Sequence, residues 1–210
     1  MIYPCDLIIS IDPGTTEMGW CVSAVSLAGV ERIASGTERL GSGHMGGRLN
    51  KALAFLVPLM KRYAALHHDV WVAFEDVGGG GQGKGKGFRG KTSKATTRAL
   101  GAAVGVIYQA AHSAGIPAHR IAPVALSTAK KHATDNGRAE KEEMMVAFET
   151  ATGCTARKSD EADAYWIGSC LAAILLRMVA KPSTQVWRTI SKTHADVAKK
   201  AKAKARKRAS

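Results

Sequence analysis

The sequence is poor in the residues that stabilise small secreted or zinc-binding domains. It has only 4 cysteines in 210 residues, and Cys5, Cys21, Cys154 and Cys170 form no C-x-x-C pair. The 7 histidines fall at no spacing typical of metal ligands, so we expect no zinc site. Scattered thiols of this kind are typical of a reducing compartment, where they pack as small buried hydrophobes.

Long hydrophobic runs are also missing. No apolar stretch approaches the roughly 20 residues that a membrane-spanning helix needs, and the longest, 165–180, is interrupted by Gly168, Ser169 and Arg177. The N-terminus has no basic leader, so we expect no signal peptide. These absences predict a soluble protein that is not secreted and has no membrane partner, located in the cytoplasm of a bacterium or a virus-infected host cell.

Acidic residues are scarce relative to basic ones. The chain has 17 Asp and Glu against 30 Lys and Arg, a net charge of +13. Residues 181–210 hold ten of the cations and a single acid, Asp196, so this end carries +9 and residues 1–180 only +4. An Ala/Lys segment with almost no apolar face is not expected to fold alone. We therefore predict a folded domain over 1–180 and a disordered basic tail over 181–210, which either binds a polyanion or only aids solubility.

A second basic cluster lies in and beside the glycine-rich stretch 78–90. It contains no acid, and its members are Lys84, Lys86, Arg89, Lys91, Lys94 and Arg98. Such clusters are typical of surfaces that bind nucleic acid or another polyanion. Phe88, inside the cluster, could stack on an exposed base. The alternative is a solvated linker, because glycine-rich segments are usually flexible.

The hydrophobic pattern predicts an α/β chain. Strands are expected over 7–12, 19–25, 30–37, 70–77 and 116–122, and helices over 48–67, 92–115, 123–132, 138–150 and from a cap at Ser159. The first two strands form a hairpin. Three strands precede the first helix, which indicates a mixed sheet flanked by helices rather than an alternating Rossmann repeat. Gly101 and Gly105 give the second helix a small-residue face that could pack on its own sheet or on a second copy.

Four carboxylates are candidates for chemistry. Asp12 ends the first strand, Glu75 interrupts a strand that is otherwise nearly all apolar, and Asp160 and Asp163 open the last helix. A spacing of three places the last two on one helical face. Asp163 is surrounded in sequence by apolar residues, which is costly for a charge without a partner. For Asp160 and Glu161 a simpler interpretation exists, since acids in a first helical turn complement the helix dipole.

If the four acids converge, cations must hold them together. Two carboxylates about 4 Å apart repel by about 4 kcal/mol at an effective dielectric constant near 20. Oxygen ligands favour Mg²⁺ or Mn²⁺, and two such ions can orient a water nucleophile and neutralise the leaving oxyanion of a phosphodiester. The acids therefore predict a metal-dependent nuclease with two ions per active site.

The chain also resembles a known family, the RuvC-type Holliday-junction resolvases, which have a ribonuclease H-like fold. The similarity runs in order from about residue 7 to residue 177. Each motif alone is weak, but several in order at plausible separations are fairly specific. The matching segments are 9–15 with Gly19, the strand ending at Glu75, 100–105, 123–141 and 160–164.

The resemblance implies roles for individual residues. Asp12, Glu75, Asp160 and Asp163 match the family's catalytic acids, with Asp12 bridging both metal ions. Lys141 matches a lysine that contacts the phosphate near the cut, and Lys130 or Lys131 another that contacts DNA. Arg138 lies in the same matching segment and is assigned to DNA binding. The implied activity is the resolution of four-way DNA junctions by paired nicks, carried out by a homodimer.

The chain departs from the family pattern in ways that suit a viral or otherwise divergent member. The loop between Glu75 and Leu100 is longer and richer in Gly and Lys than in cellular members, where a shorter loop carries an aromatic wedge, and Phe88 is the candidate here. The basic tail is an addition. The preferred branched substrate therefore stays open.

Three other functions are also consistent with parts of the sequence. The segment 12–16 also resembles the first phosphate motif of actin-like ATPases and sugar kinases, but 210 residues without a second such motif cannot supply their two domains. A non-catalytic nucleic-acid-binding protein would explain the charge but not acids placed beside a polyanion. An RNA-processing nuclease of the same fold has identical catalytic needs and is not separated by sequence.

Overall fold

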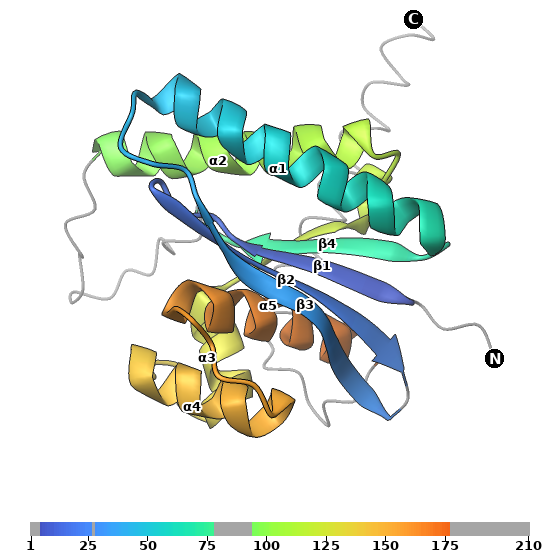
Figure 1. The fold of residues 1–210 in the computed structure, drawn as a ribbon. Coiled ribbons are helices and arrows are strands. Elements are labelled where there is room, and N and C mark those ends of the chain that lie inside the picture. Colours follow the sequence, from blue (N-terminus) through green and yellow to red (C-terminus); the bar gives the residue numbers. More distant parts are fainter. Residues whose placement is uncertain (1–4, 27, 78–93, 177–210) are drawn as a thin grey trace, which may run out of the picture.

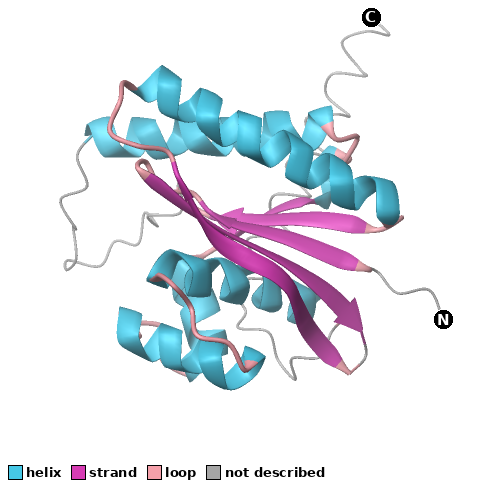
Figure 2. Ribbon diagram, in the orientation of Figure 1, coloured by secondary structure: helices cyan, strands magenta, loops and turns pink. Residues whose placement is uncertain are grey.

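The computed structural model describes residues 5–26, 28–77 and 94–176. The predicted DNA-binding residues Lys84, Lys86, Phe88, Arg89 and Lys91 lie outside these ranges, as does the predicted basic tail over 181–210. The described part is a mixed sheet with a layer of helices on each face (Figures 1 and 2). This is the predicted α/β architecture.

The sheet has five strands in the order β3-β2-β1-β4-β5. Their bounds are β1 Leu7–Asp12, β2 Glu17–Ser26, β3 Gly29–Arg39, β4 Val70–Glu75 and β5 Ile121–Val124. β1 pairs antiparallel with β2 and parallel with β4, and β4 pairs parallel with β5. The predicted hairpin and mixed sheet are confirmed, with β1 at the centre.

Among the described residues, helices cover both faces of the sheet (Figure 1). The first layer is α1 Met45–Leu66 and α2 Lys94–Ser113; the second is α3 Leu126–Thr134, α4 Lys141–Thr152 and α5 Ser159–Leu175. Alternate residues of β1 pack against the two helical layers, because successive side chains of a strand point to opposite faces. Ile9 packs in the core beside α1 and α2, and Ile8 in the core beside α5.

The predictions around the last strand were wrong in register. A 3-10 turn, Ala118–Arg120, occupies part of the predicted strand 116–122, and β5 runs from Ile121 to Val124. Pro123 was expected to open a helix but lies within β5, at the edge of the sheet. Val124 turns its carbonyl oxygen toward β4, where it accepts a hydrogen bond from the Asp76 backbone. Pro123 therefore faces the open edge, where its missing N–H breaks no ladder bond.

Helix starts also differ from prediction. α1 begins at Met45, three residues before the predicted position, because His44 caps it and its Nδ1 accepts from the Gly47 N–H at 3.2 Å. α4 begins at Lys141 rather than residue 138, after a capping box between Glu140 and Glu143. Ser159 was expected to cap α5, but it is the first helical residue, and Lys158 precedes it without a side-chain cap.

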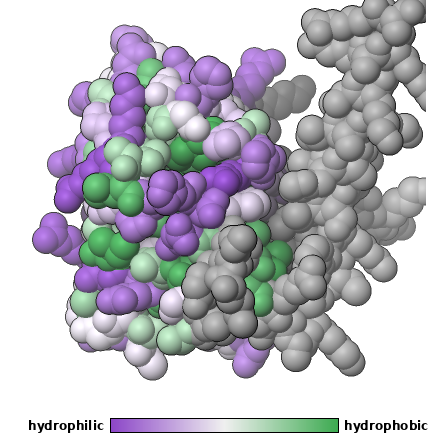
Figure 3. Space-filling model, turned by 90° about the vertical axis from the view of Figure 1, so that its right-hand side faces the viewer, coloured by the Kyte–Doolittle hydropathy of each residue, from purple (hydrophilic) through white to green (hydrophobic). Residues whose placement is uncertain are grey.

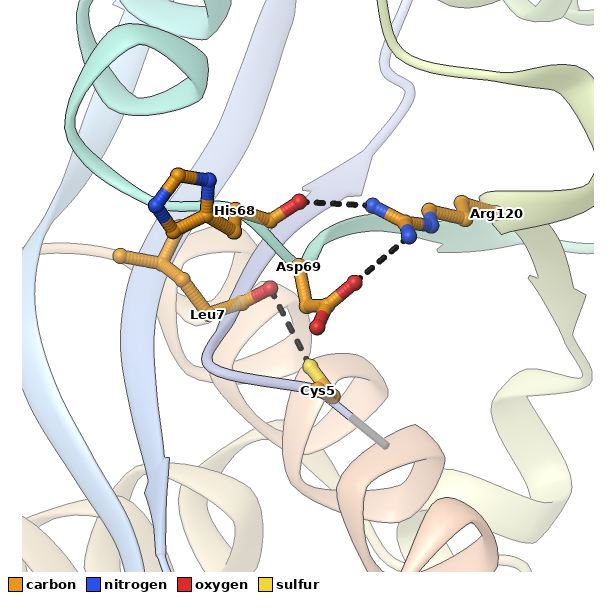
Figure 4. A network of polar contacts seen from close by, with 5 residues as sticks. All are labelled: Cys5, Leu7, His68, Asp69 and Arg120. Atoms are coloured by element: carbon orange, nitrogen blue, oxygen red, sulfur yellow. Dashed lines mark hydrogen bonds and ion pairs between the residues drawn. The ribbon is translucent and has the colours of Figure 1, made fainter. Parts of the chain in front are cut away.

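Polar contacts fix the amino ends of the two central parallel strands (Figure 4). Arg120 pairs with Asp69 at 2.5 Å and donates to the His68 carbonyl at 2.8 Å. The Cys5 thiol donates to the Leu7 carbonyl at 3.3 Å, and burial raises the pKa of this thiol to about 12. Cys5 is therefore an inert packing residue, as expected from the sequence.

No helix in the described ranges is long and apolar enough to cross a bilayer. On the face that lies to the right in Figure 1, hydrophilic and hydrophobic residues are intermixed in small areas wherever described residues are visible (Figure 3).

Candidate active site

Asp12 and Glu75 lie side by side at the carboxyl ends of neighbouring parallel strands. Ile11 pairs with Phe74 in the register of β1 and β4, so the next residue of each strand is one of the two acids. Their side chains lie within reach of each other, because burial and then the charge of Glu75 raise the pKa of Asp12. The strand pairing thus brings together two acids that are 63 positions apart in the sequence.

Asp160 and Asp163 reach the same end of the sheet from α5. The helix can approach closely because two glycines lie at the contact. A Cβ atom added to Gly19 would lie 1.9 Å from the Asp160 carbonyl oxygen, and one added to Gly168 would lie 2.7 Å from Ser10 Oγ. Gly19 is also the register partner of Asp12 on β1. The start of α5 therefore rests on β2 directly beside the end of β1.

The four acids interact electrostatically. Burial raises the pKa of Asp12 well above its usual value, and the charges of Glu75, Asp163 and Asp160 raise it further. Burial likewise raises the pKa of Glu75. Burial raises the pKa of Asp163 to about 6, with further contributions from Asp160 and Glu75. The structure therefore brings the four predicted acids together, and their mutual repulsion favours proton or cation binding.

Two lysines from the segment between β5 and α5 face this acidic group. Lys130, on α3, lowers the pKa values of Asp163 and Glu75, and Lys141, at the start of α4, lowers that of Asp163. Lys130 Nζ also donates to the Ala139 carbonyl at 2.7 Å, which ties α3 to the loop before α4. The sequence left open whether Lys130 or Lys131 matches the family's second DNA-contacting lysine. Lys130 lies beside the acids, whereas Lys131 is exposed.

Arg138 was predicted to bind DNA and lies in the loop before α4. Its side chain is exposed, and its backbone N–H donates to Asn136 Oδ1 at 3.0 Å. Its DNA-binding role stays a prediction.

The acids are suited to binding a divalent cation. Asp163 Oδ1 is buried without a hydrogen-bond partner within the described residues. In the same ranges, no three His, Cys, Asp or Glu side chains are arranged as a ready set of metal ligands. A cation bound between the acids would provide the partner that Asp163 Oδ1 lacks. All donors would be carboxylate oxygens, the ligands that Mg²⁺ and Mn²⁺ prefer.

Sequence reasoning missed three residues around the site. Asp76, directly after Glu75, adds negative charge and raises the pKa of Glu75. Arg48 on α1 donates to the Thr15 carbonyl at 2.6 Å and so holds the turn that follows Asp12. Glu161, assigned to the helix dipole, is buried instead. The acid beside Glu75 was visible in the sequence, but the contacts of Arg48 and Glu161 depend on tertiary structure.

The chain is similar in sequence to curated RuvC proteins. It is 32% identical over 164 residues to the crossover junction endodeoxyribonuclease RuvC of Anaeromyxobacter dehalogenans, covering 78% of this chain and 79% of that protein. It is 29% identical over 168 residues to the RuvC of Rickettsia conorii, covering 79% of this chain and 96% of that protein. No protein-family model matches the chain.

Solved structures share the fold. Thermus thermophilus RuvC in complex with a Holliday junction substrate superposes with a TM-score of 0.64 at 23% identity, covering 84% of this chain and 98% of that one. The yeast mitochondrial Holliday junction resolvase Ydc2 superposes with a TM-score of 0.52 at 11% identity, covering 85% and 82%. The described fold, a mixed sheet between helical layers, is that of these resolvases. Together with the sequence similarity over most of its length, this shows that the chain belongs to the RuvC family of crossover junction endodeoxyribonucleases.

Proposed function

We propose that this protein is a metal-dependent endodeoxyribonuclease that resolves four-way DNA junctions by paired strand cuts. The observation that carries the proposal is the convergence of four acids from three elements, β1, β4 and α5, at one end of the sheet. Membership in the RuvC family of crossover junction endodeoxyribonucleases indicates that the reaction at these acids is DNA strand cleavage.

Asp12, Glu75, Asp160 and Asp163 are the proposed ligands of two Mg²⁺ or Mn²⁺ ions. Bound cations of this kind activate a water nucleophile and neutralise the leaving oxygen of a phosphodiester. The acids bind a cation only when they are deprotonated. Because burial raises the pKa of Asp163 to about 6, a proton competes with the cation for this carboxylate below neutral pH. The buried, unpartnered Asp163 Oδ1 supports a ligand role for this residue.

The positive charge needed to hold DNA lies on the same side as the acids. Lys130 and Lys141 are close enough to stabilise the charged form of Asp163. We propose that Lys141 contacts the phosphate beside the cut and that Lys130 contacts the adjacent DNA backbone. Arg138 follows on the exposed loop, and the basic residues Lys84, Lys86, Arg89 and Lys91, with Phe88, are proposed to extend DNA contacts outside the described ranges.

The decisive experiment compares cleavage of four substrates in Mg²⁺: a four-way DNA junction, a replication fork, linear duplex DNA and a structured RNA. The proposal expects the junction to be cut fastest and in symmetry-related strands. Faster cleavage of RNA would favour the RNA-processing alternative. Tight binding without cleavage of any substrate, in Mg²⁺ or Mn²⁺, would contradict the nuclease assignment.

We also propose that the active form is a homodimer, because one site cuts one strand and a junction has approximate two-fold symmetry. α2 supports this. Gly101 and Gly105 are exposed, and a Cβ added to either would meet no atom within 4 Å. The buried residues of this helix, such as Ile107 and Ala110, face the sheet instead. Of the two packing partners that the sequence left open, the geometry favours a second copy.

Mixed dimers test the assembly. When active subunits are mixed with Asp12→Asn subunits, a supercoiled cruciform should yield mainly single nicks, since each mixed dimer has one working site. Sedimentation at micromolar concentration gives the oligomeric state independently. Paired cuts made by a sedimenting monomer would contradict the homodimer.

A further inference from the structure

Glu161 is a buried carboxylate between the two proposed catalytic aspartates of α5. Its exposed fraction is 5%, although acids in the first turn of a helix usually point into solvent. Burial of a carboxylate is costly unless its oxygens are hydrogen-bonded. The hydrogen-bond partners of this side chain therefore indicate how its buried charge is stabilised.

Both oxygens of Glu161 accept hydrogen bonds from different parts of the chain. Ser35 Oγ on β3 donates to Oε1 at 2.5 Å, and the Arg157 backbone N–H donates to Oε2 at 2.9 Å. The Arg32 guanidinium donates to Ser35 Oγ and to Cys154 Sγ, each at 3.0 Å. The positive charge of Arg32 thus reaches the carboxylate through one hydroxyl group, so the buried charge is compensated.

This network connects the first turn of α5 to β3 and, through strand pairing, to the strands beside the site. Ser35 pairs with Cys21 across β3 and β2, and two residues earlier on β2 Gly19 pairs with Asp12 on β1. The Asp160 backbone rests on Gly19 without room for a side chain between them. Two separate contacts, one through Gly19 and one through Glu161, therefore fix where α5 begins relative to Asp12.

We propose that Glu161 and Ser35 are positioning residues that set the cation affinity of the site by holding Asp160 and Asp163 in place against Asp12 and Glu75. This inference rests on the proposed metal-binding function. Neither residue touches the reacting atoms. Partners that orient metal ligands typically change affinity by 10–100-fold when they are removed.

The test uses the full chain and the variants Glu161→Gln and Ser35→Ala. The first removes the buried charge, and the second removes the link to β3 but keeps the Arg157 bond. The matched control is Glu149→Gln, because Glu149 accepts a comparable bond from Thr155 Oγ1, at 3.1 Å, on the exposed surface. Mn²⁺ binding is measured without DNA by electron paramagnetic resonance. The Mg²⁺ concentration for half-maximal junction cleavage is measured separately.

We expect each variant to bind Mn²⁺ roughly tenfold more weakly and to need roughly tenfold more Mg²⁺, with cleavage recovering at high Mg²⁺. The double variant should be little weaker than either single one, because both act through the same bond. The control should match the parent protein. Ser35→Ala keeps the test valid if Glu161→Gln fails to fold.

Two results would overturn the inference. One is parental Mn²⁺ affinity in folded variants, even if their melting temperature falls, since that identifies a structural role only. The other is a loss of cleavage that no Mg²⁺ concentration restores. If the parent binds Mn²⁺ but cuts no branched DNA while the variants weaken Mn²⁺ binding, the proposed nuclease activity fails and the positioning role stands.

Discussion

The backbone of Asp160 lies directly on Gly19, and a Cβ atom added to this glycine would lie 1.9 Å from the Asp160 carbonyl oxygen. Gly19 in turn pairs with Asp12. The contact therefore couples the position of one proposed ligand to that of another across the sheet.

Gly19→Ala is expected to displace the start of α5. The clash is with backbone, which cannot rotate away, so we expect a loss of about 2 kcal/mol in the free energy of unfolding. We also expect the rate of junction cleavage to fall, because Asp160 would be displaced from the other acids. Urea unfolding and a junction cleavage assay give the two quantities. Gly43→Ala is the control, because a Cβ there meets no atom within 4 Å. Parental cleavage by Gly19→Ala would show that α5 needs no such close approach.

Asp12→Asn should abolish cleavage while junction binding is kept or strengthened. The substitution removes an anionic ligand and one negative charge beside the DNA backbone. A loss of at least a hundredfold in turnover is expected, measured with saturating enzyme, and a gel-shift assay without metal measures binding. Asp135→Asn is the matched control, since Asp135 is exposed and has a φ of 59°, which Asn tolerates well. Turnover within tenfold of the parent would refute the assignment of Asp12.

The metal-free protein should lose stability as the pH rises through about 6. The pKa of Asp163 is raised by burial from 3.8 to about 6 in the folded state, so the folded state binds the proton more tightly than the unfolded state. The stability linked to this group is fully present below pH 3.8 and is lost as the pH rises through about 6. The loss is about 3 kcal/mol at pH 8.

Asp163→Asn checks this linkage. The variant should have a higher melting temperature than the parent at pH 8 without metal, and the difference should shrink at pH 4. Mg²⁺ should narrow the gap at pH 8 by stabilising the parent alone. A melting-temperature difference between the two proteins that does not change from pH 4 to pH 8 would contradict the raised pKa.

Lys130→Ala should move the acid limb of the pH dependence of cleavage upward by roughly one pH unit, because Lys130 lowers the pKa of Asp163. Lys130→Arg keeps the charge and should leave the limb near its parental position. Lys131→Ala, on the exposed side of the same helix, should leave the limb unmoved even if it weakens DNA binding. Equal shifts from Lys130→Ala and Lys131→Ala would show that the effect is general electrostatics rather than the position of Lys130.

The sequence was sufficient to predict the architecture, because apolar runs and turns are local features, and it singled out the four acids that the structure brings together. Apolar runs and their turns identify the strands, and an acid inside such a run, as at Glu75, is conspicuous. Pro123 was misassigned because proline is favoured both in the first turn of a helix and on a sheet edge. Only the position of β5 at the edge separates the two.

The parts of the site that escaped prediction depend on distant partners. Ser35 and Glu161 are 126 positions apart, and nothing near Glu161 in the sequence distinguishes it from an ordinary first-turn acid. The choice between Lys130 and Lys131 likewise required the direction in which α3 faces. Gly19 was noticed as part of a motif, but its physical role became clear only when Asp160 was placed on top of it.

Both edges of the sheet carry features that discourage further strands from adding to it. On β5, Pro123 offers no N–H to an incoming strand. On β3, the register with β2 shifts between Val22 and Ser23, which leaves Ile33 as an extra, exposed residue that distorts the edge. Proline and bulges at sheet edges are established protections against amyloid-like aggregation. At high protein concentration, copies of this protein should therefore resist edge-to-edge polymerisation.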